Sequence, residues 1–365
     1  MSRNQSACSR LQHPAHGILA RRLAQSAFML AAIWLVGCER EAPLIEVEGP
    51  TMGTYYSVKV VNAPAGLTAQ TLQHEVESTL NQVISEISTY DPNSELSRLN
   101  RNPSTDWIPV SSNLFEVIAE GQRIAALTDG AFDVTVGPLV NLWGFGPEAK
   151  TGEPPTPEAI QAALARVGWK NLELRTEPPA IRKTRGDLYI DLSALGEGVG
   201  ADRVSAMLDA QGIRHDMVAV AGTIRAKGYN AKGQPWSIAI EEPLPDQRIV
   251  HRIVPVSDRA ISTSGDYRNF FEKDGKRYSH EIDPKTGSPI ESHLGSATVM
   301  GDRAMVVDGL ATALMVLGDK RGPALAADQG LAAYFIVRDG TTLRGFGSPN
   351  FGNDTVSAIR QNGNP

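Results

Sequence analysis

The spacing of apolar residues divides the chain into helical and extended segments. Apolar residues three and four apart predict helices over residues 68–90, 95–100, 111–128, 157–167, 198–212, 304–317 and 320–330. Alternating or β-branched runs predict strands over residues 54–61, 187–192, 216–221, 236–241, 252–256 and 332–338. Because the strands come in pairs with helices interspersed, the pattern favours an α+β fold over a regular β-α alternation.

The predicted helix over 304–317 carries two polar residues within an apolar run. Asp308 and Thr312 are four residues apart, so they lie on one face of a helix, one turn apart. A carboxylate and a hydroxyl on one face suit a small hard cation such as Mg²⁺. The structural alternative is that Asp308 caps the helix and Thr312 bonds back to a carbonyl oxygen.

The first residues have the form of a secretion signal. Arg21 and Arg22 precede the mostly apolar residues 23–36, and Gly37 and Cys38 complete a lipobox. We therefore expect residues 1–37 to be a lipoprotein signal peptide, with Cys38 acylated and residues 38–46 acting as a tether. The apolar stretch is too short to span a bilayer comfortably.

Loss of residues 1–37 makes the chain more acidic. That piece holds four arginines and no acid, so the formal charge becomes −6 − 4 = −10. An acidic surface argues against nucleic acid as a partner. Of the two cysteines, Cys8 leaves with the signal and Cys38 would carry lipid, so no disulfide is expected.

Further polar segments lie next to predicted strands, and each has a functional and a structural interpretation. Met52 could stack on a flat ring or fill the core, and Tyr90 could face a pocket or be half-buried packing. Asp133 could border a ligand site or a strand-to-turn corner, where its charge needs a partner. Asp191 and Glu197 flank a glycine-rich turn and suggest hydrogen bonds to a ligand's donors.

The hydroxyl cluster in residues 261–268 could bind phosphate groups of a ligand. His280 follows this cluster in the sequence. His280 stands before an Asp-Pro turn and shortly before the candidate metal helix, which favours function over a structural role. The sequence contains no zinc-type Cys/His pattern and no G-x-S-x-G nucleophile elbow.

Seven short motifs follow one another in a characteristic order. They occupy residues 52–54, 88–90, 130–133, 191–198, 261–268, 280–287 and 308–318. Together they resemble the ApbE family of flavin transferases (FAD:protein FMN transferases), over residues 47–345. The resemblance implies an ApbE-like two-lobed mixed-sheet domain with flanking helices, followed by a C-terminal tail over residues 346–365.

The resemblance also implies roles for individual residues. Metal ligands carry over to Ala194, Asp308, Ala311 and Thr312, with the alanines acting through main-chain carbonyls. Flavin contacts carry over to Met52, Tyr90, Ala131, Phe132, Asp133, Asp191, Glu197 and Ile282. His280 is the first candidate for a catalytic base and Asp283 the second.

The chain departs from the family pattern at three places. Members often have lysine where this chain has Glu197, and Gly-Gly followed by an acid or amide where it has residues 221–223. Some relatives have an acid at position 311, where Ala311 offers no side-chain ligand. These departures affect the expected contacts with adenine and the expected affinity for the metal, and they leave the class of enzyme unchanged.

The implied enzyme binds FAD and Mg²⁺, transfers FMN to a serine or threonine hydroxyl of a partner redox protein, and releases AMP. We expect it on the periplasmic side of the inner membrane, lipid-anchored beside membrane redox acceptors. The alternatives are a Mg²⁺-dependent FAD pyrophosphatase giving FMN and AMP, and a non-catalytic flavin-binding lipoprotein.

Overall fold

The computed structural model describes residues 41–147 and 152–352. The predicted signal peptide 1–37 and Cys38 lie outside the described residues. The expected tether over 38–46 overlaps the first strand, because β1 already begins at Leu44. The expected tail over 346–365 is ordered at its start, because β17 extends to Gly347 and Phe351 is buried in an apolar cluster.

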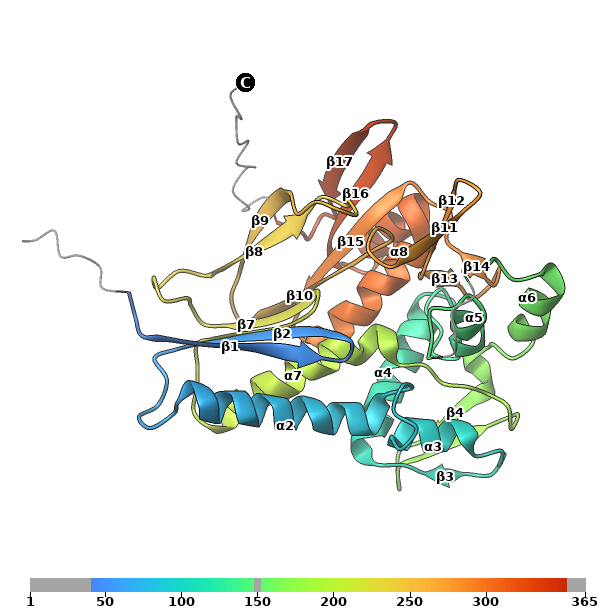
Figure 1. The fold of residues 1–365 in the computed structure, drawn as a ribbon, viewed down its shortest axis with the longest axis horizontal. Coiled ribbons are helices and arrows are strands. Elements are labelled where there is room, and N and C mark those ends of the chain that lie inside the picture. Colours follow the sequence, from blue (N-terminus) through green and yellow to red (C-terminus); the bar gives the residue numbers. More distant parts are fainter. Residues whose placement is uncertain (1–40, 148–151, 353–365) are drawn as a thin grey trace, which may run out of the picture. The chain divides into compact units, whose positions relative to one another are not determined.

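An antiparallel sheet of eight strands forms the centre of the protein (Figure 1). Its order is β1 (Leu44–Thr51), β2 (Thr54–Val61), β6 (Asp216–Val220), β7 (Thr223–Lys227), β10 (Arg259–Gly265), β15 (Leu294–Gly301), β16 (Ala332–Asp339) and β17 (Thr342–Gly347). Helices α2 (Ala69–Ile87), α7 (Ser193–Ala210) and α8 (Ala304–Asp328) pack against one face and bury the larger apolar core.

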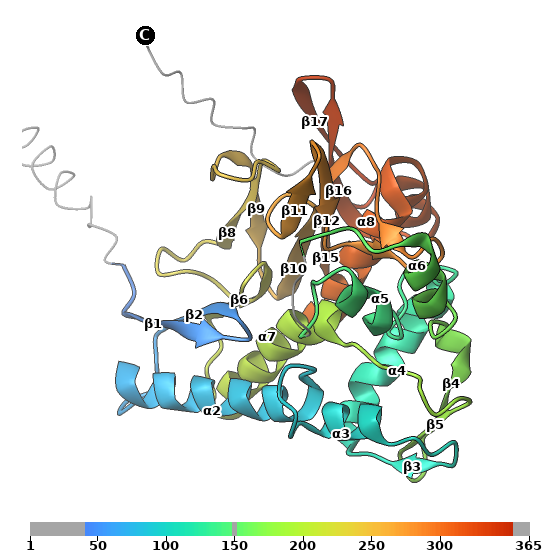
Figure 2. The ribbon, with the colours of Figure 1, turned by 45° about the vertical axis from the view of Figure 1, so that its right-hand side comes forward.

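The other face of the sheet is covered by a hairpin, β8 (Trp236–Glu241) and β9 (Val250–Val256). Trp236, Ile238 and Ile240 alternate along β8 and are buried against side chains of the large sheet, among them Ile261 and Tyr334. Alternation gives each strand a buried side, so the hairpin closes a second apolar core. Figure 2 shows this hairpin across the sheet from α2.

A smaller group of elements packs beside the C-terminal end of α2. It comprises α3 (Glu95–Arg101), β3 (Ile108–Pro109), α4 (Ser112–Leu127), α5 (Gly137–Leu142), α6 (Pro157–Leu164), η1 (Trp169–Asn171), β4 (Leu172–Arg175) and β5 (Ala180–Lys183). Two further hairpins join β11 (Phe270–Lys273) to β12 (Lys276–Ser279) and β13 (Ile282–Asp283) to β14 (Ser288–Pro289). A third apolar cluster, which includes Leu139, Trp143 and Ile282, links α5 to β13.

Lys183, at the end of β5, is fully buried and holds this smaller group together. Its ammonium donates to the carbonyl oxygens of Leu99 at 3.2 Å and Gly186 at 3.3 Å, and also to that of Asn102. Burial lowers the pKa of Lys183, which Asp187 partly offsets. The ammonium thereby satisfies carbonyls at the C-terminal end of α3 that the helix itself leaves open.

The α+β prediction and most predicted elements are confirmed. The predicted strands at 54–61, 216–221, 236–241, 252–256 and 332–338 correspond to β2, β6, β8, β9 and β16. The helices over 68–90, 95–100 and 111–128 correspond to α2, α3 and α4, and the Ser94 side chain caps α3. The last two predicted helices form α8, broken at Gly318, where φ is 76°.

Two predictions around residue 190 are wrong. Residues 187–192 are not a strand, because Ile190 donates to and accepts from the Asn100 side chain, at 2.8 Å each, instead of a neighbouring strand. Helix α7 begins at Ser193 rather than 198, so the predicted glycine-rich turn is the first part of that helix. Gly198 lets α8 approach closely, because a Cβ there would lie 2.4 Å from the Ala304 carbonyl oxygen.

The Gly198→Ala substitution should therefore lower the free energy of unfolding by about 1–3 kcal/mol, because the added methyl group forces α7 and α8 apart. The matched control is Gly196→Ala on the same helix, whose added Cβ would meet only Ile87, at 3.9 Å. In that variant, alanine should stabilise the helix slightly. Urea denaturation measures both, and equal stability of the two variants would contradict the close approach.

Asp216, at the start of β6, predicts a pH-dependent stability. Burial raises its pKa to about 7, with Lys227 opposing the shift and Asp209 adding to it. Between pH ~4 and ~7 the folded chain keeps a proton that the unfolded chain releases, so the free energy of unfolding falls as pH rises through this window.

The Asp216→Asn variant cannot ionise and should lose this dependence, which amounts to up to about 4 kcal/mol. Denaturation at a series of pH values measures it, with exposed Asp246→Asn as control. Parallel stability curves for wild type and Asp216→Asn would refute the assignment.

Candidate functional site

A large cavity opens where the β1–β2 turn, the start of α7, the first half of α8 and the loop after β12 meet. Its volume is about 1400 Å³. Twelve of the predicted site residues line it: Met52, Tyr90, Ala131, Phe132, Asp133, Asp191, Ala194, Glu197, His280, Ile282, Asp308 and Thr312. These residues come from positions spread over most of the sequence, and the fold brings them to one place.

Two predicted site residues lie elsewhere. Ala311 is fully buried in the main core and does not line the cavity. Asp283 does not line it either, and its Oδ1 accepts from the backbone N–H of Lys285 at 2.8 Å. The Asp283 carboxylate thus stabilises its own turn, which leaves His280 as the candidate base inside the cavity.

Asp308 is held by donors from three separate elements. Its carboxylate accepts from the Gly198 N–H at 2.9 Å, the Thr223 hydroxyl at 3.2 Å and the Ser262 hydroxyl at 3.3 Å. Burial raises the pKa of Asp308 well above its usual value, and nearby Glu197 raises it further. The helix-cap interpretation is wrong, because α8 begins at Ala304 with Arg303 at its N-cap.

Glu197 lies on the same wall and contacts the β6–β7 turn. Its Oε2 accepts from the Gly222 N–H at 3.2 Å and lies 3.5 Å from the Thr223 hydroxyl oxygen. Burial raises the pKa of Glu197, and these hydrogen bonds oppose the shift. Two of the places where the sequence departs from the family pattern are therefore in direct contact.

Thr312 extends the oxygen-rich wall along α8. Its hydroxyl lies 3.2 Å from that of Ser264 on β10, and Ser264 also lines the cavity. Carboxylate, hydroxyl and carbonyl oxygens suit a hard cation, and Mg²⁺ completes its coordination with water and substrate phosphates. Among residues 41–147 and 152–352, no three His, Cys, Asp or Glu side chains gather as a metal centre. A cation here would therefore depend on such mixed oxygen ligands.

The surroundings of His280 determine which of its ring nitrogens carries the hydrogen in the neutral ring. Nδ1 lies 3.1 Å from the backbone oxygen of Asn269, and because a carbonyl only accepts, Nδ1 is the donor. In the neutral ring, Nε2 then keeps its lone pair. Nε2 lies 3.8 Å from Oε1 of Glu281, which is buried, and this burial raises the pKa of Glu281.

Flat and apolar residues also line the cavity, among them Met52, Tyr90 and Phe132. Tyr90 is 62% exposed, and its hydroxyl donates to the Phe145 backbone oxygen at 3.1 Å. Asp133 accepts from Thr135 and from the Trp169 N–H at 2.9 Å, which favours the strand-to-turn interpretation of this residue. Met52, at the β1–β2 turn, has a positive φ of 50°.

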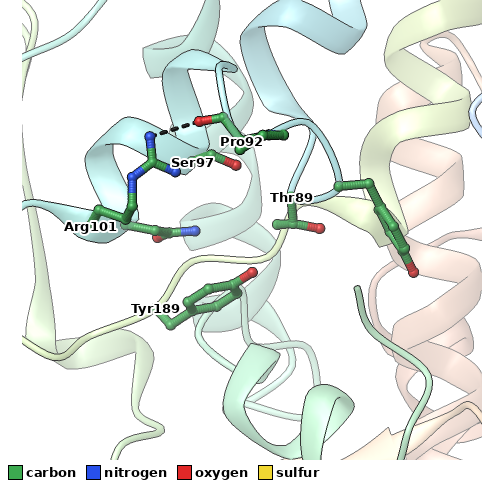
Figure 3. Close-up of a pocket in the computed structure, with 7 residues that line it drawn as sticks. Thr89, Pro92, Ser97, Arg101 and Tyr189 are labelled. Atoms are coloured by element: carbon green, nitrogen blue, oxygen red, sulfur yellow. Dashed lines mark hydrogen bonds between the residues drawn. The ribbon is translucent and has the colours of Figure 1, made fainter. Parts of the chain in front are cut away.

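A smaller cavity of about 210 Å³ shares Thr89 and Tyr90 with the large one. Figure 3 shows it between Thr89, Ser97 and Tyr189, with Arg101 donating to the Pro92 carbonyl oxygen. Its volume is below the ~300 Å³ at which small-molecule sites begin. The large cavity is therefore the candidate site.

Sequence reasoning missed several residues of this site. Thr223 and Glu281 lie within segments that the sequence did indicate, but neither was given a role in the site, and residues 238–241 of β8, which line the cavity, were not singled out. Ser262 and Ser264 fall within the hydroxyl cluster that the sequence did indicate. Glu281 offered one signal, a charged residue next to the candidate base His280.

Comparisons with known proteins agree on one family. The model of the ApbE family matches residues 52–335. A "FAD:protein FMN transferase" of Vibrio cholerae is 45% identical over 323 residues, covering 88% of this chain and 96% of the relative. The protein of the same name in Escherichia coli K12 is 38% identical, covering 91% and 97%.

Solved structures give the same result. The "Flavin Transferase ApbE from Vibrio cholerae" superposes with a TM-score of 0.79 at 44% identity, covering 85% of this chain and 98% of that one. The Pseudomonas stutzeri flavinyl transferase ApbE, in its apo form, gives a TM-score of 0.77 at 39% identity, covering 85% and 96%.

Within the described part of the chain, no helix has both the length and the apolarity needed to cross a membrane.

Proposed function

Because this chain belongs to the ApbE family, we propose that it is an FAD:protein FMN transferase. The observation that carries the proposal is the gathering of twelve predicted site residues around one cavity in a fold shared with flavin transferases. A hydroxyl of the acceptor protein attacks the FMN-side phosphorus of FAD, the pyrophosphate bond breaks, and AMP leaves.

Different residues of the cavity lining suit different parts of the dinucleotide. Tyr90, Phe132 and Met52 offer flat and apolar surface that suits the isoalloxazine ring. The hydroxyl-rich wall with Ser264 and Thr312 suits the diphosphate. The chain's own work is mainly to position the reacting groups, as in phosphoryl transfer generally.

His280 acts as the base in this proposal. The Asn269 carbonyl fixes its Nδ1–H, so Nε2 can take the proton from the attacking hydroxyl. The buried Glu281 carboxyl lies 3.8 Å from the same nitrogen.

We propose Mg²⁺ as the cation, held by the Asp308 carboxylate, the Thr312 hydroxyl and the carbonyl oxygen of Ala194. Two observations support this set. Asp308 is a buried carboxylate with no cationic partner among its hydrogen bonds, and its three hydrogen-bond partners are one N–H and two hydroxyl groups. The Gly198 N–H donates to Asp308, whereas in a regular helix it would donate to Ala194. When bound, the cation offsets the negative charge that develops on the phosphate oxygens.

We also propose that the chain is lipid-anchored through Cys38 on the periplasmic side of the inner membrane, near membrane redox proteins as acceptors. The support is the lipobox and the signal-like residues 1–37. An anchor would confine the enzyme to the surface where such acceptors lie.

The His280→Ala variant should transfer FMN about 10²–10⁴-fold more slowly, because the attacking hydroxyl loses its base. Mass spectrometry of an acceptor incubated with FAD and Mg²⁺ measures the transfer. The control is His74→Ala, at an exposed position on α2 outside the cavity. Unchanged transfer by the His280 variant would exclude the assigned base. Release of free FMN and AMP by the wild type without acceptor, at a comparable rate, would favour the pyrophosphatase.

The Asp308→Asn variant should have a higher thermal midpoint than the wild type without Mg²⁺, because it no longer buries an ionisable group. With FAD already present, added Mg²⁺ should raise the midpoint of the wild type by a further few degrees and that of the variant much less, because a ligand stabilises the folded state only where it binds. Asp328→Asn, exposed on the same helix, is the control. An equal rise in both chains would refute Asp308 as a ligand.

A further inference from the structure

One edge of strand β8 borders the cavity without a strand beside it. Within the described residues, β8 pairs with β9 alone, and these two form a separate two-stranded sheet. The four consecutive residues Ile238, Ala239, Ile240 and Glu241 line the cavity, and no residue of β9 does. Because neighbouring side chains of a strand point to opposite faces, a cavity lined by consecutive residues meets the strand at its edge.

Pro255 identifies which backbone groups of β8 lie on that open edge. It stands opposite Ser237 in the β8–β9 register, and proline has no N–H to donate to a partner strand. The Ser237–Pro255 pair is therefore of the non-hydrogen-bonded type, and hydrogen-bonded pairs alternate with it along the strands. The N–H and C=O groups of Ala239, two residues on, consequently point away from β9 and toward the open edge.

The cavity has room for more than one reactant. At about 1400 Å³ it exceeds the roughly 300–1,000 Å³ of typical small-molecule sites. The proposed function requires a protein segment to enter beside the dinucleotide, since the attacking hydroxyl belongs to a protein. The edge of β8 belongs to this same cavity and is uncharged at Ile238, Ala239 and Ile240.

We propose that the acceptor protein docks by adding an extended, uncharged segment to the open edge of β8, with its serine or threonine directed toward the dinucleotide. Backbone hydrogen bonds to Ala239 hold the segment, as in other cases of strand addition. This docking mode requires an extended segment, because the backbone N–H and C=O groups of a helix are already hydrogen-bonded within the helix. The inference rests on the proposed transferase activity.

The test uses Ala239→Pro, which removes one outward N–H and leaves the β8–β9 pairing in place. Pro255 shows that this two-stranded sheet already accommodates proline. The probe is the short threonine peptide, drawn from a pooled library of extended uncharged sequences, that the wild type flavinylates fastest. Loss of the hydrogen bond should raise KM for this peptide about tenfold, with a much smaller change in kcat.

Ala239→Ser separates the loss of the amide from a change of side chain, because serine keeps the N–H. The serine variant should show a much smaller rise in KM than the proline variant. A fluorescence titration with FAD and a thermal melt show whether the proline variant remains folded, and a folded variant with wild-type KM overturns the docking mode.

Two other outcomes separate this inference from the proposed function. If the wild type adds FMN to proteins of a membrane extract but to no extended peptide, strand addition is wrong and the transferase assignment stands. If it adds FMN to neither, the proposed function itself fails.

Discussion

The close approach of α7 and α8 is the constraint on which the site depends. At Gly198 the two helices meet with no space for a side chain, and the Gly198 N–H points at Asp308. This contact places a carboxylate from the end of the sequence beside the start of a helix from its middle. The sheet supplies the remaining donors, Thr223 on β7 and Ser262 on β10, so the carboxylate joins the helical layer to the sheet.

The two departures from the family pattern at this wall form a single unit. Glu197 stands where relatives often have a lysine, and it accepts from the Gly222 N–H and lies next to the Thr223 hydroxyl. An acid or amide after a Gly-Gly pair would suit a lysine at 197, whereas a hydroxyl and a free N–H suit a glutamate. This chain therefore combines a glutamate with neutral donors at this wall, where relatives often combine a lysine with an acid or amide.

Local patterns located most of the helices but only three strands of the central sheet, β2, β6 and β16; β1, β7, β10, β15 and β17 were not predicted. Periodicity located α2, α4, β8 and β16, because amphipathic spacing reflects burial on one side. It failed at residues 187–192, where a side chain of α3 satisfies the Ile190 backbone, a long-range contact that no local pattern reveals. Helix α7 was placed too late because its glycines suggest a turn, whereas they serve helix packing.

The site was predictable in outline because its motifs recur in a fixed order. The roles that depend on the orientation of a side chain could not be predicted from the sequence. Asp283 follows Ile282 directly, yet Ile282 lines the cavity and the aspartate stabilises a turn. The sequence around Glu281 has neither helical nor strand-like periodicity, so no local pattern indicates that this side chain is buried beside His280.

The buried Lys183 has a consequence for chemical probing of the protein. Its amine donates to three main-chain oxygens and has no exposed surface. Acylating reagents require a solvent-accessible, deprotonated amine, so this lysine is sheltered while the strands and helices around it stay closed. Its modification would thus report local opening of the smaller group of elements, independently of the flavin site.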